Sequence, residues 1–527
     1  MIGDMQTWTP NVAGIIEHAR EIHPKTEIIS RLVSGEIHRS NYENVCIRAR
    51  KLASALEKDG IQNGDVIATL ALNTYRHLEM YYGISGMGAV THTLNFRLHP
   101  EQAVYIINHA EDKMIFVELP FVPILEALQD NLKTVEKYVV LCEVEEMPKT
   151  SLKNAISYEE YIEDGDENYK WPNLADDAAC ALCYTSGTTG NPKGVLYSHK
   201  SNIIHAQASL TALTIQSDDS ILMVVPLFHV LAWGIPYFGA MNGLKLVMPG
   251  MQMEGEPLYE LIDQEDVTLA FGVPTIWMGL LAYCRENNKI LTSVRNTIIG
   301  GSALSLATLQ EFDEVHDVNV IHAWGMTEMS PLGTTNVPTQ EMKNMPKEEK
   351  YAIQLKQGRP IYGVELKVVD DQGNELPKDG KSQGHLMVRG PWILQKYFKA
   401  EKDAVDADGW FDLEDPDCNG SAFGAEVGLI SDVACNDGMD NDGDGQTYLE
   451  GDCDDTNASR ETLDLDSDGF TTCGGDCNDQ LLAIHPDALE VCDDVDNDCD
   501  DYMMLQYGAE WVKKCTAEVR LKLVLNH

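Results

Sequence analysis

The sequence predicts an α/β fold for the first 412 residues and an irregular acidic tail for the rest of the 527-residue chain. In the first part, strand-like apolar runs alternate with helical stretches, which is the pattern of parallel sheets with crossover helices. Several of these runs end in glycine-rich loops, and open α/β sheets bind ligands at the carboxyl ends of their strands. From about Gly358, short strands joined by Gly/Asp turns predict a small β subdomain that ends near residue 412.

The expected elements follow one another along the chain. An amphipathic helix is expected within residues 1–23, and further helices at 74–89, 101–110, 122–132 and 305–316. Strands are expected at 65–72, 113–118, 137–143, 179–185, 220–226, 244–250, 267–274 and 319–325. In the β subdomain, "VELKVVDDQGNELP" (364–377) and "GHLMVRG" (384–390) have the pattern of short strands bounded by turns.

Charge divides the chain into two regions. Residues 413–527 hold 29 Asp and Glu against 5 Lys and Arg, a net charge of −24 within a total of −45. Such acidity argues against nucleic acid or an anionic membrane as a partner. No run approaches the roughly 18 apolar residues of a membrane span. Because the N-terminus lacks a basic region followed by an apolar one, we expect no signal peptide and a cytoplasmic protein.

The stretch "YTSGTTGNPKGVLYSH" (184–199) follows an apolar run and has the residues that a polyphosphate needs. Glycine lets the backbone approach a ligand closely. Hydroxyls and free N–H groups bind anionic oxygens, and a following helix would add its positive N-terminal end. We therefore expect a strand-to-helix phosphate loop with Lys193 as its point charge. The alternative is a flexible Ser/Thr/Gly surface loop.

Five motifs occur in the order found in adenylate-forming enzymes: "YTSGTTGNPKG", "GGSALS", "WGMTE", "GRPIYGVELKVVD" and "DGWFD". Over about residues 10–412 the chain most resembles acyl-CoA ligases of the medium-chain and methylthiopropionate type, through "NTYRHLEMYYGISGMGAVTHTLNFRL" and "PLFHVLAWGIPY". The resemblance implies a large adenylate-forming domain with ATP, Mg²⁺ and coenzyme A as cofactors and a small carboxylate as substrate. An oligomer is possible, and the sequence does not give the oligomeric state.

The resemblance assigns roles to residues of these motifs. The catalytic group is Thr185, Lys193, Thr327 and Glu328, with Glu328 as the ligand of Mg²⁺. The nucleotide would also contact Ser186, Gly187, Thr188, Thr189, Gly190, Gly301, Ser302, Ala303, Ala323, Trp324, Gly325 and Met326. Trp324 stands where the family often has tyrosine, and either ring can stack on the base. For Glu328 the alternative is a carboxylate that stabilises a helix N-terminus.

The acyl group is expected to lie against the segment that begins "PLFHV". By resemblance His229 lines and can gate this pocket, which Trp233 and Gly234 also shape. The alternative is that His229 is only a core residue. Asp415 falls at the position of the family's ribose-binding aspartate, but Leu413 and Glu414 replace the threonine and glycine that usually precede it.

Beyond residue 412 the resemblance ends. The family continues with a C-terminal lid that carries an adenylation lysine and rotates to complete the thioester site. Lys513, Lys514 and Lys522 are the lysines beyond 412, and none has a matching sequence around it. We therefore expect that the acidic tail replaces the lid, which places both half-reactions in question. The abrupt change within "GWFDLEDPD" suggests a fusion or an assembly artefact.

The tail contains a repeat with a period of 24 residues. The carboxylates that recur at alternate positions are Asp440, Asp442 and Asp444, then Asp464, Asp466 and Asp468, with a third copy at Asp494, Asp496 and Asp498. Such spacing followed by glycine begins a calcium loop. The segment 413–502 resembles the Asp/Cys-rich calcium repeats of thrombospondin type 3, whereas 503–527 resembles neither part. The alternative is a disordered acidic tail.

The distribution of cysteines also separates the acidic tail from the first 412 residues. Eight of the 13 cysteines lie in the last 115 residues, as in a disulfide-bonded extracellular segment. The other five are expected to be reduced and mostly buried. Three functions therefore remain open: an acyl-CoA ligase, a nucleotide- and acyl-binding remnant without turnover, and a calcium-binding surface protein.

Overall fold

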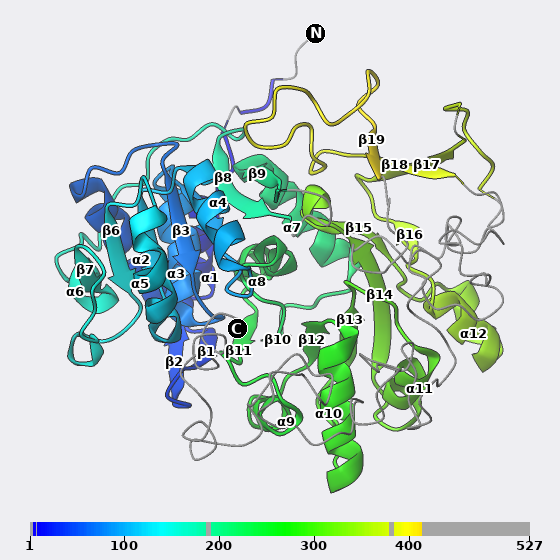
Figure 1. Cartoon of the computed structure of the whole chain (residues 1–527). Helices are drawn as coiled ribbons and strands as arrows, with labels where there is room; N and C mark the ends of the chain where they lie inside the picture. Colours follow the sequence, from blue (N-terminus) through cyan, green and yellow to red (C-terminus); the bar gives the residue numbers. More distant parts are fainter. Residues whose placement is uncertain (1–3, 7, 186–190, 371, 379–383, 414–527) are drawn as a thin grey trace, which may run out of the picture. The chain divides into compact units, whose positions relative to one another are not determined.

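The computed structural model describes residues 4–6, 8–185, 191–370, 372–378 and 384–413. The described residues all belong to one compact unit. Their strands form three sheets, and Figure 1 labels the strands and helices. Two of these sheets are mainly parallel and carry helices on their faces, as the alternating pattern predicts. The loop residues 186–190, Asp415 and the whole acidic repeat lie outside the described residues.

The first sheet has seven strands. In spatial order they are β7 (Ala155–Ser157), β6 (Lys137–Val140), β5 (Met114–Val117), β3 (Val66–Leu70), β4 (Val90–Thr93), β8 (Ala179–Tyr184) and β9 (Gly194–Ser198). All neighbours pair in parallel except β8 and β9, which are antiparallel. Its helices are α2 (Tyr42–Lys58), α3 (Tyr75–Gly86), α4 (Pro100–Ala110), α5 (Val122–Leu128) and α6 (Tyr158–Glu163). One buried cluster joins the sheet to α2, α3 and α6, and another joins it to α4 and α5.

The second sheet has nine strands. In spatial order they are β16 (Arg359–Pro360), β15 (Leu332–Thr335), β14 (Asn319–Gly325), β13 (Asn296–Ile299), β12 (Leu269–Gly272), β10 (Ser220–Met223), β11 (Lys245–Met248), β1 (Glu27–Arg31) and β2 (Ile37–Asn41). The central strands are parallel, and antiparallel pairs form at both edges. The remaining helices are α1 (Val12–Ile22), α7 (His199–Ala212), α8 (Ile235–Asn242), α9 (Gly255–Gln264), α10 (Pro274–Asn287), α11 (Leu306–Glu314) and α12 (Lys347–Gln354).

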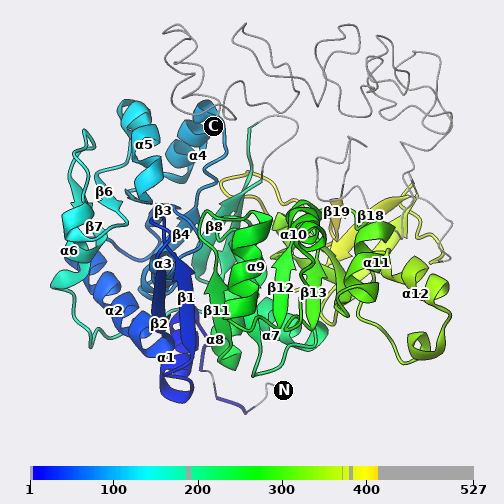
Figure 2. The same ribbon diagram turned by 90° about the horizontal axis from the view of Figure 1, so that it is seen from below.

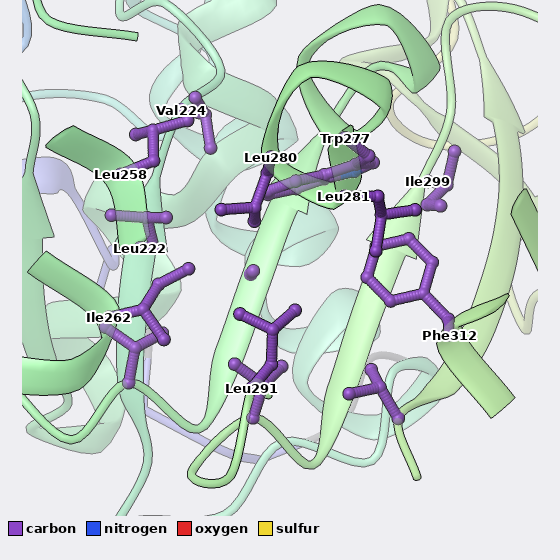
Figure 3. Packing of buried hydrophobic residues seen from close by; sticks show 14 of the residues in the cluster. Leu222, Val224, Leu258, Ile262, Trp277, Leu280, Leu281, Leu291, Ile299 and Phe312 are labelled. Atoms are coloured by element: carbon purple, nitrogen blue, oxygen red, sulfur yellow. The ribbon is translucent and has the colours of Figure 1, made fainter. Parts of the chain in front are cut away.

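Helices α9, α10 and α11 pack on one face of the nine-stranded sheet (Figure 2). Trp277, Leu280 and Leu281 of α10 point toward the strands, between Leu258 of α9 and Phe312 of α11 (Figure 3). Fully burying one such side chain stabilises a fold by about 1.5–3 kcal/mol. This core therefore holds β13 and β14 in fixed positions, and these strands carry the predicted nucleotide residues at their ends.

Asn73 joins the two large sheets. Its side-chain Nδ2 donates hydrogen bonds of 2.8 Å to the carbonyls of Met223 and Val225, and its Oδ1 accepts one of 2.7 Å from the Leu227 amide. Asn73 follows β3, whereas Met223 ends β10. The carboxyl edges of the two sheets thus meet at a buried amide, at the edge where ligands bind in such folds.

The third sheet is the predicted β subdomain. Strands β17 (Glu365–Val369), β18 (His385–Arg389) and β19 (Phe411–Leu413) pair in antiparallel order. In the described part of the chain, no helix has the length and apolarity that crossing a membrane requires.

Candidate functional site

The predicted phosphate loop connects two strands of a hairpin. The Thr185 amide donates a 2.9 Å hydrogen bond to the Lys193 carbonyl, and the Lys193 amide approaches the Thr185 hydroxyl at 3.4 Å. The ends of the loop are therefore held together, and Lys193, the residue before strand β9, is exposed.

The expected strand-to-helix connection is wrong. Strand β9 follows the loop, and α7 begins only at His199. Val195 and Tyr197 are buried while Leu196 between them is exposed, which is the two-residue period of a strand with one covered face. The N-terminus of α7 therefore does not directly follow the loop.

Thr327 and Glu328 lie in a tight turn after β14. Both belong to the short 3₁₀ turn η5 (Thr327–Met329), and their exposed fractions are 8% and 6%. A Cβ added to Gly325 would lie 1.9 Å from the Pro331 carbonyl oxygen, so glycine is required where the turn folds back. Because η5 is a single turn, the alternative role of Glu328 at the N-terminus of an α-helix does not apply.

Two tyrosines connect this turn to the hairpin. Tyr197 of β9 donates a buried 2.7 Å hydrogen bond to the Thr327 carbonyl. Tyr397 donates a 2.7 Å hydrogen bond to Oε1 of Glu328, and Lys193 Nζ lies 5.1 Å from the centroid of the Tyr397 ring. Lys193 and Glu328 come from separate motifs, and both contact the side chain of Tyr397.

Burial raises the pKa of Glu328, while the Tyr397 hydrogen bond and the nearby Lys193 charge lower it. The net direction is upward because burial disfavours the charged carboxylate. Burial and the Glu328 carboxylate also raise the pKa of Tyr397, so its hydroxyl keeps its proton and acts as a donor. Neither tyrosine is among the site residues that the sequence predicts. Tyr197 has a weak signal in the alternation of "GVLYS", and Tyr397 has none.

The segments predicted to flank the nucleotide lie on neighbouring strands. Gly301, Ser302 and Ala303 follow β13, while Ala323, Trp324 and Gly325 end β14, which pairs in parallel with β13. Gly301 has a φ of 85° and therefore adopts the left-handed conformation that favours glycine. Met326 follows β14 and its amide bonds to the Pro331 carbonyl at 3.1 Å.

Trp324 is mostly buried, with an exposed fraction of 5%. Its ring packs so closely on Gly333 that a Cβ there would lie 2.9 Å from Trp324 Cζ3. Its indole Nε1 has no hydrogen-bond partner among the residues that the structure describes. Stacking of this ring on a base stays a prediction.

The expected acyl segment forms an unusual turn. His229 is half-buried, and desolvation lowers its pKa to about 4. The next residues, Val230 to Trp233, have φ values between 44° and 57°, and Gly234 has a φ of 82°. A left-handed turn of non-glycine residues costs roughly 1–2 kcal/mol per residue, and such strain occurs at functional sites.

Trp233 lies close to the ends of β13 and β14. A Cβ added to Gly300 would lie 3.2 Å from Trp233 Cη2 and 2.8 Å from the Ala323 carbonyl oxygen. Gly234 faces a different ring, since its Cβ would lie 3.0 Å from Cε1 of His205. The predicted acyl and nucleotide segments are therefore adjacent, whereas a role for His229 beyond the core stays a prediction.

Comparison with known proteins identifies the family. The family model for AMP-binding enzymes matches residues 16–398, so the chain belongs to the AMP-binding enzyme family. It is 47% identical over 413 residues to a 3-methylmercaptopropionyl-CoA ligase of Ruegeria lacuscaerulensis. The matched region covers 78% of this chain and 77% of that relative. It is 45% identical over 417 residues to a medium-chain-fatty-acid–CoA ligase of Ectopseudomonas oleovorans. This match covers 79% of this chain and 76% of that relative.

A solved structure shows the same fold. A long-chain-fatty-acid-CoA ligase from Archaeoglobus fulgidus superposes with a TM-score of 0.67 at 23% identity, covering 78% of this chain and 83% of that one. The tail carries a second match: the Cu-binding MopE metal-binding motif aligns with residues 452–461 and 476–503. The matched ranges include the third predicted copy, Asp494 to Asp498, whereas the copies at 440–444 and 464–468 lie outside them. A metal-binding motif in the tail is therefore shown by sequence, and calcium binding by the predicted aspartates stays a prediction.

Proposed function

We propose that this chain is an ATP-dependent acyl-CoA ligase for a short- or medium-chain carboxylate. The carboxylate would attack the α-phosphate of ATP to give an acyl adenylate and pyrophosphate, and the coenzyme A thiol would then displace AMP. Family membership and relatives named for medium-chain fatty acids and 3-methylmercaptopropionate support this proposal. The observation that carries it is the meeting of Lys193 and Glu328 at Tyr397.

The described residues have suitable positions for the first step. Lys193 is exposed beside the loop and would bind the β- and γ-phosphates together with Thr185 and residues 186–190. Thr327 would bind the α-phosphate, where negative charge increases during attack. Because the Thr327 carbonyl is fixed by Tyr197, the donor would be positioned before the reaction begins. Catalysis of this kind is mostly positioning and electrostatic stabilisation.

Glu328 would hold Mg²⁺. The described residues contain no group of three or more His, Cys, Asp or Glu side chains that could bind a metal by themselves. One buried carboxylate beside a phosphate loop fits Mg²⁺, which commonly takes one or two carboxylates and completes its shell with phosphates and water. When bound, Mg²⁺ would neutralise part of the phosphate charge.

The experiment uses the full chain with ATP, Mg²⁺, coenzyme A and a panel of carboxylates from acetate to decanoate, with 3-methylmercaptopropionate included. We expect AMP and one acyl-CoA product by mass spectrometry, strongest for a short or medium chain. Matched reactions with Lys193→Ala protein are the control. ATP binding without AMP or thioester from any acid would instead indicate the nucleotide-binding remnant.

We also propose that the tail binds a metal ion through its aspartates. The 24-residue repeat of alternate carboxylates and the matched motif support this proposal. Oxygen ligands at this spacing favour calcium, whereas the matched motif is named for copper. Equilibrium dialysis of the full chain against Ca²⁺ and Cu²⁺, with a chain ending at residue 413 as the control, tests it. Equal uptake by both chains would contradict it.

A further inference from the structure

The segment Leu394–Phe398 is bonded to both halves of the candidate site. The Leu394 amide donates a 2.8 Å hydrogen bond to the Glu328 carbonyl, and the Phe398 amide donates one of 2.8 Å to the Gly194 carbonyl. A Cβ on Gly194 would lie 3.0 Å from Phe398 Cβ, so the two backbones approach closely. These two backbone hydrogen bonds, at Leu394 and Phe398, fix the backbone on either side of Tyr397.

The side chain of Tyr397 also contacts both halves of the candidate site, through its hydroxyl and its ring. Its hydroxyl donates to Oε1 of Glu328, and its ring face lies under the Lys193 ammonium. A hydrogen bond to a buried carboxylate is stronger than one between neutral groups. A cation near an aromatic face is attracted by the ring quadrupole. Tyr397 thus contacts both Glu328, the proposed ligand of the metal, and Lys193, which is proposed to bind the phosphates.

We propose that Tyr397 is a positioning residue for nucleotide binding. Its hydroxyl fixes the orientation of the Glu328 carboxylate toward Mg²⁺, and its ring holds the Lys193 ammonium on the side of the phosphates. This inference rests on the proposed function and adds to it a residue outside the five motifs. It predicts that the hydroxyl and the ring have separable effects, one dependent on Mg²⁺ and the other not.

A packing role makes a different prediction. The Tyr397 ring also contacts Phe411 edge to face at 6.4 Å, so the side chain could only support the fold. Tyr397→Phe would then leave ligand binding unchanged, because it keeps the ring. Tyr397→Leu would lower stability and all nucleotide affinities together.

The experiment measures binding of a fluorescent ATP analogue to the full chain while Mg²⁺ is titrated. For Tyr397→Phe we expect the Mg²⁺ concentration at half-saturation to rise about tenfold, the scale of one charge-assisted hydrogen bond. Affinity without Mg²⁺ should stay within about twofold of the parent. Tyr397→Leu should also weaken Mg²⁺-free binding, because it removes the platform for Lys193. Tyr362→Phe, at a side chain that is 99% exposed, should match the parent.

A double-mutant cycle with Glu328→Gln separates positioning from packing. If Tyr397 acts through Glu328, adding Tyr397→Phe to Glu328→Gln should change the Mg²⁺ dependence by less than about twofold. The same tenfold shift in both backgrounds, or no shift in Tyr397→Phe alone, would overturn the inference. Failure of the parent chain to bind the analogue at any Mg²⁺ concentration would overturn the proposed function and this inference with it.

Discussion

The Tyr197 hydroxyl donates a 2.7 Å hydrogen bond to the Thr327 carbonyl. The strand after the predicted phosphate loop is therefore bonded directly to the turn that carries Glu328, across 130 residues of sequence. Asn73 makes a similar connection between the two large sheets. The site is thus assembled by a few buried polar groups at sheet edges rather than by any single motif.

Tyr197→Phe should lower the free energy of unfolding by about 1–3 kcal/mol, because it leaves the buried Thr327 carbonyl without its donor. It should also raise the KM for ATP, since the turn would be less fixed. Urea unfolding and steady-state kinetics measure the two effects. Tyr362→Phe is the control, because its hydroxyl is exposed. Unchanged stability in Tyr197→Phe would show that water replaces the hydrogen bond.

Lys193→Ala should weaken ATP binding at least about tenfold while leaving stability within about 0.5 kcal/mol of the parent, because the side chain is exposed. Isothermal titration with Mg²⁺–ATP gives the affinity. Lys153→Ala, at an exposed side chain that forms a surface ion pair with Asp130, controls for loss of one positive charge. Equal ATP affinities in the two variants would show that the phosphate site is misassigned.

Gly325→Ala should disrupt the turn between β14 and β15, since the new methyl group would collide with the Pro331 carbonyl. We expect a loss of about 1–3 kcal/mol in stability together with loss of nucleotide binding. Gly279→Ala is the matched control, because nothing lies within 4 Å of its added Cβ in helix α10. That substitution should stabilise the protein by about 0.5–1 kcal/mol. Thermal unfolding of both variants distinguishes them, and equal melting temperatures would contradict the prediction.

Acid should destabilise the fold through its buried histidines. Burial lowers the pKa of His77 and His199 to about 4 and that of His205 to about 3. An unfolded chain binds these protons near pH 6.5, whereas the folded chain does not. Stability therefore falls as pH decreases from about 6.5 toward 4 and is unaffected by these groups at higher pH.

The His77→Gln variant isolates one of these contributions. Between pH 7 and pH 5.5, the parent should lose about 1 kcal/mol more unfolding free energy than the variant. Urea midpoints at the two pH values measure the difference. An identical pH slope in the parent and His77→Gln would mean that His77 is protonated in the folded state as easily as in the unfolded chain.

The sequence patterns predicted the fold well where local periodicity carries the information. The runs at 65–72 and 267–274 contain β3 and β12, and the turn-bounded strands at 364–377 and 384–390 contain β17 and β18. Alternation over five residues is a weak signal beside a glycine-rich loop, so the sequence predicts a helix after the loop and not the strand β9.

The candidate site was predicted only in part. Lys193 and Glu328 belong to motifs, but the tyrosines that connect them do not, because their function depends on contacts between distant segments. The same holds for the left-handed turn Val230–Trp233, since propensity argues against positive φ at such residues. Tertiary contacts decide these conformations, and one sequence does not contain them as a local pattern.

The most direct test of the proposed adenylation is ATP–pyrophosphate exchange by the full chain with Mg²⁺ and each carboxylate of the panel. We expect exchange that depends on one class of carboxylate and that disappears in Lys193→Ala. Exchange would mean that residues 1–413 and the tail together activate an acid. Tight ATP binding with no exchange for any carboxylate would contradict the ligase function.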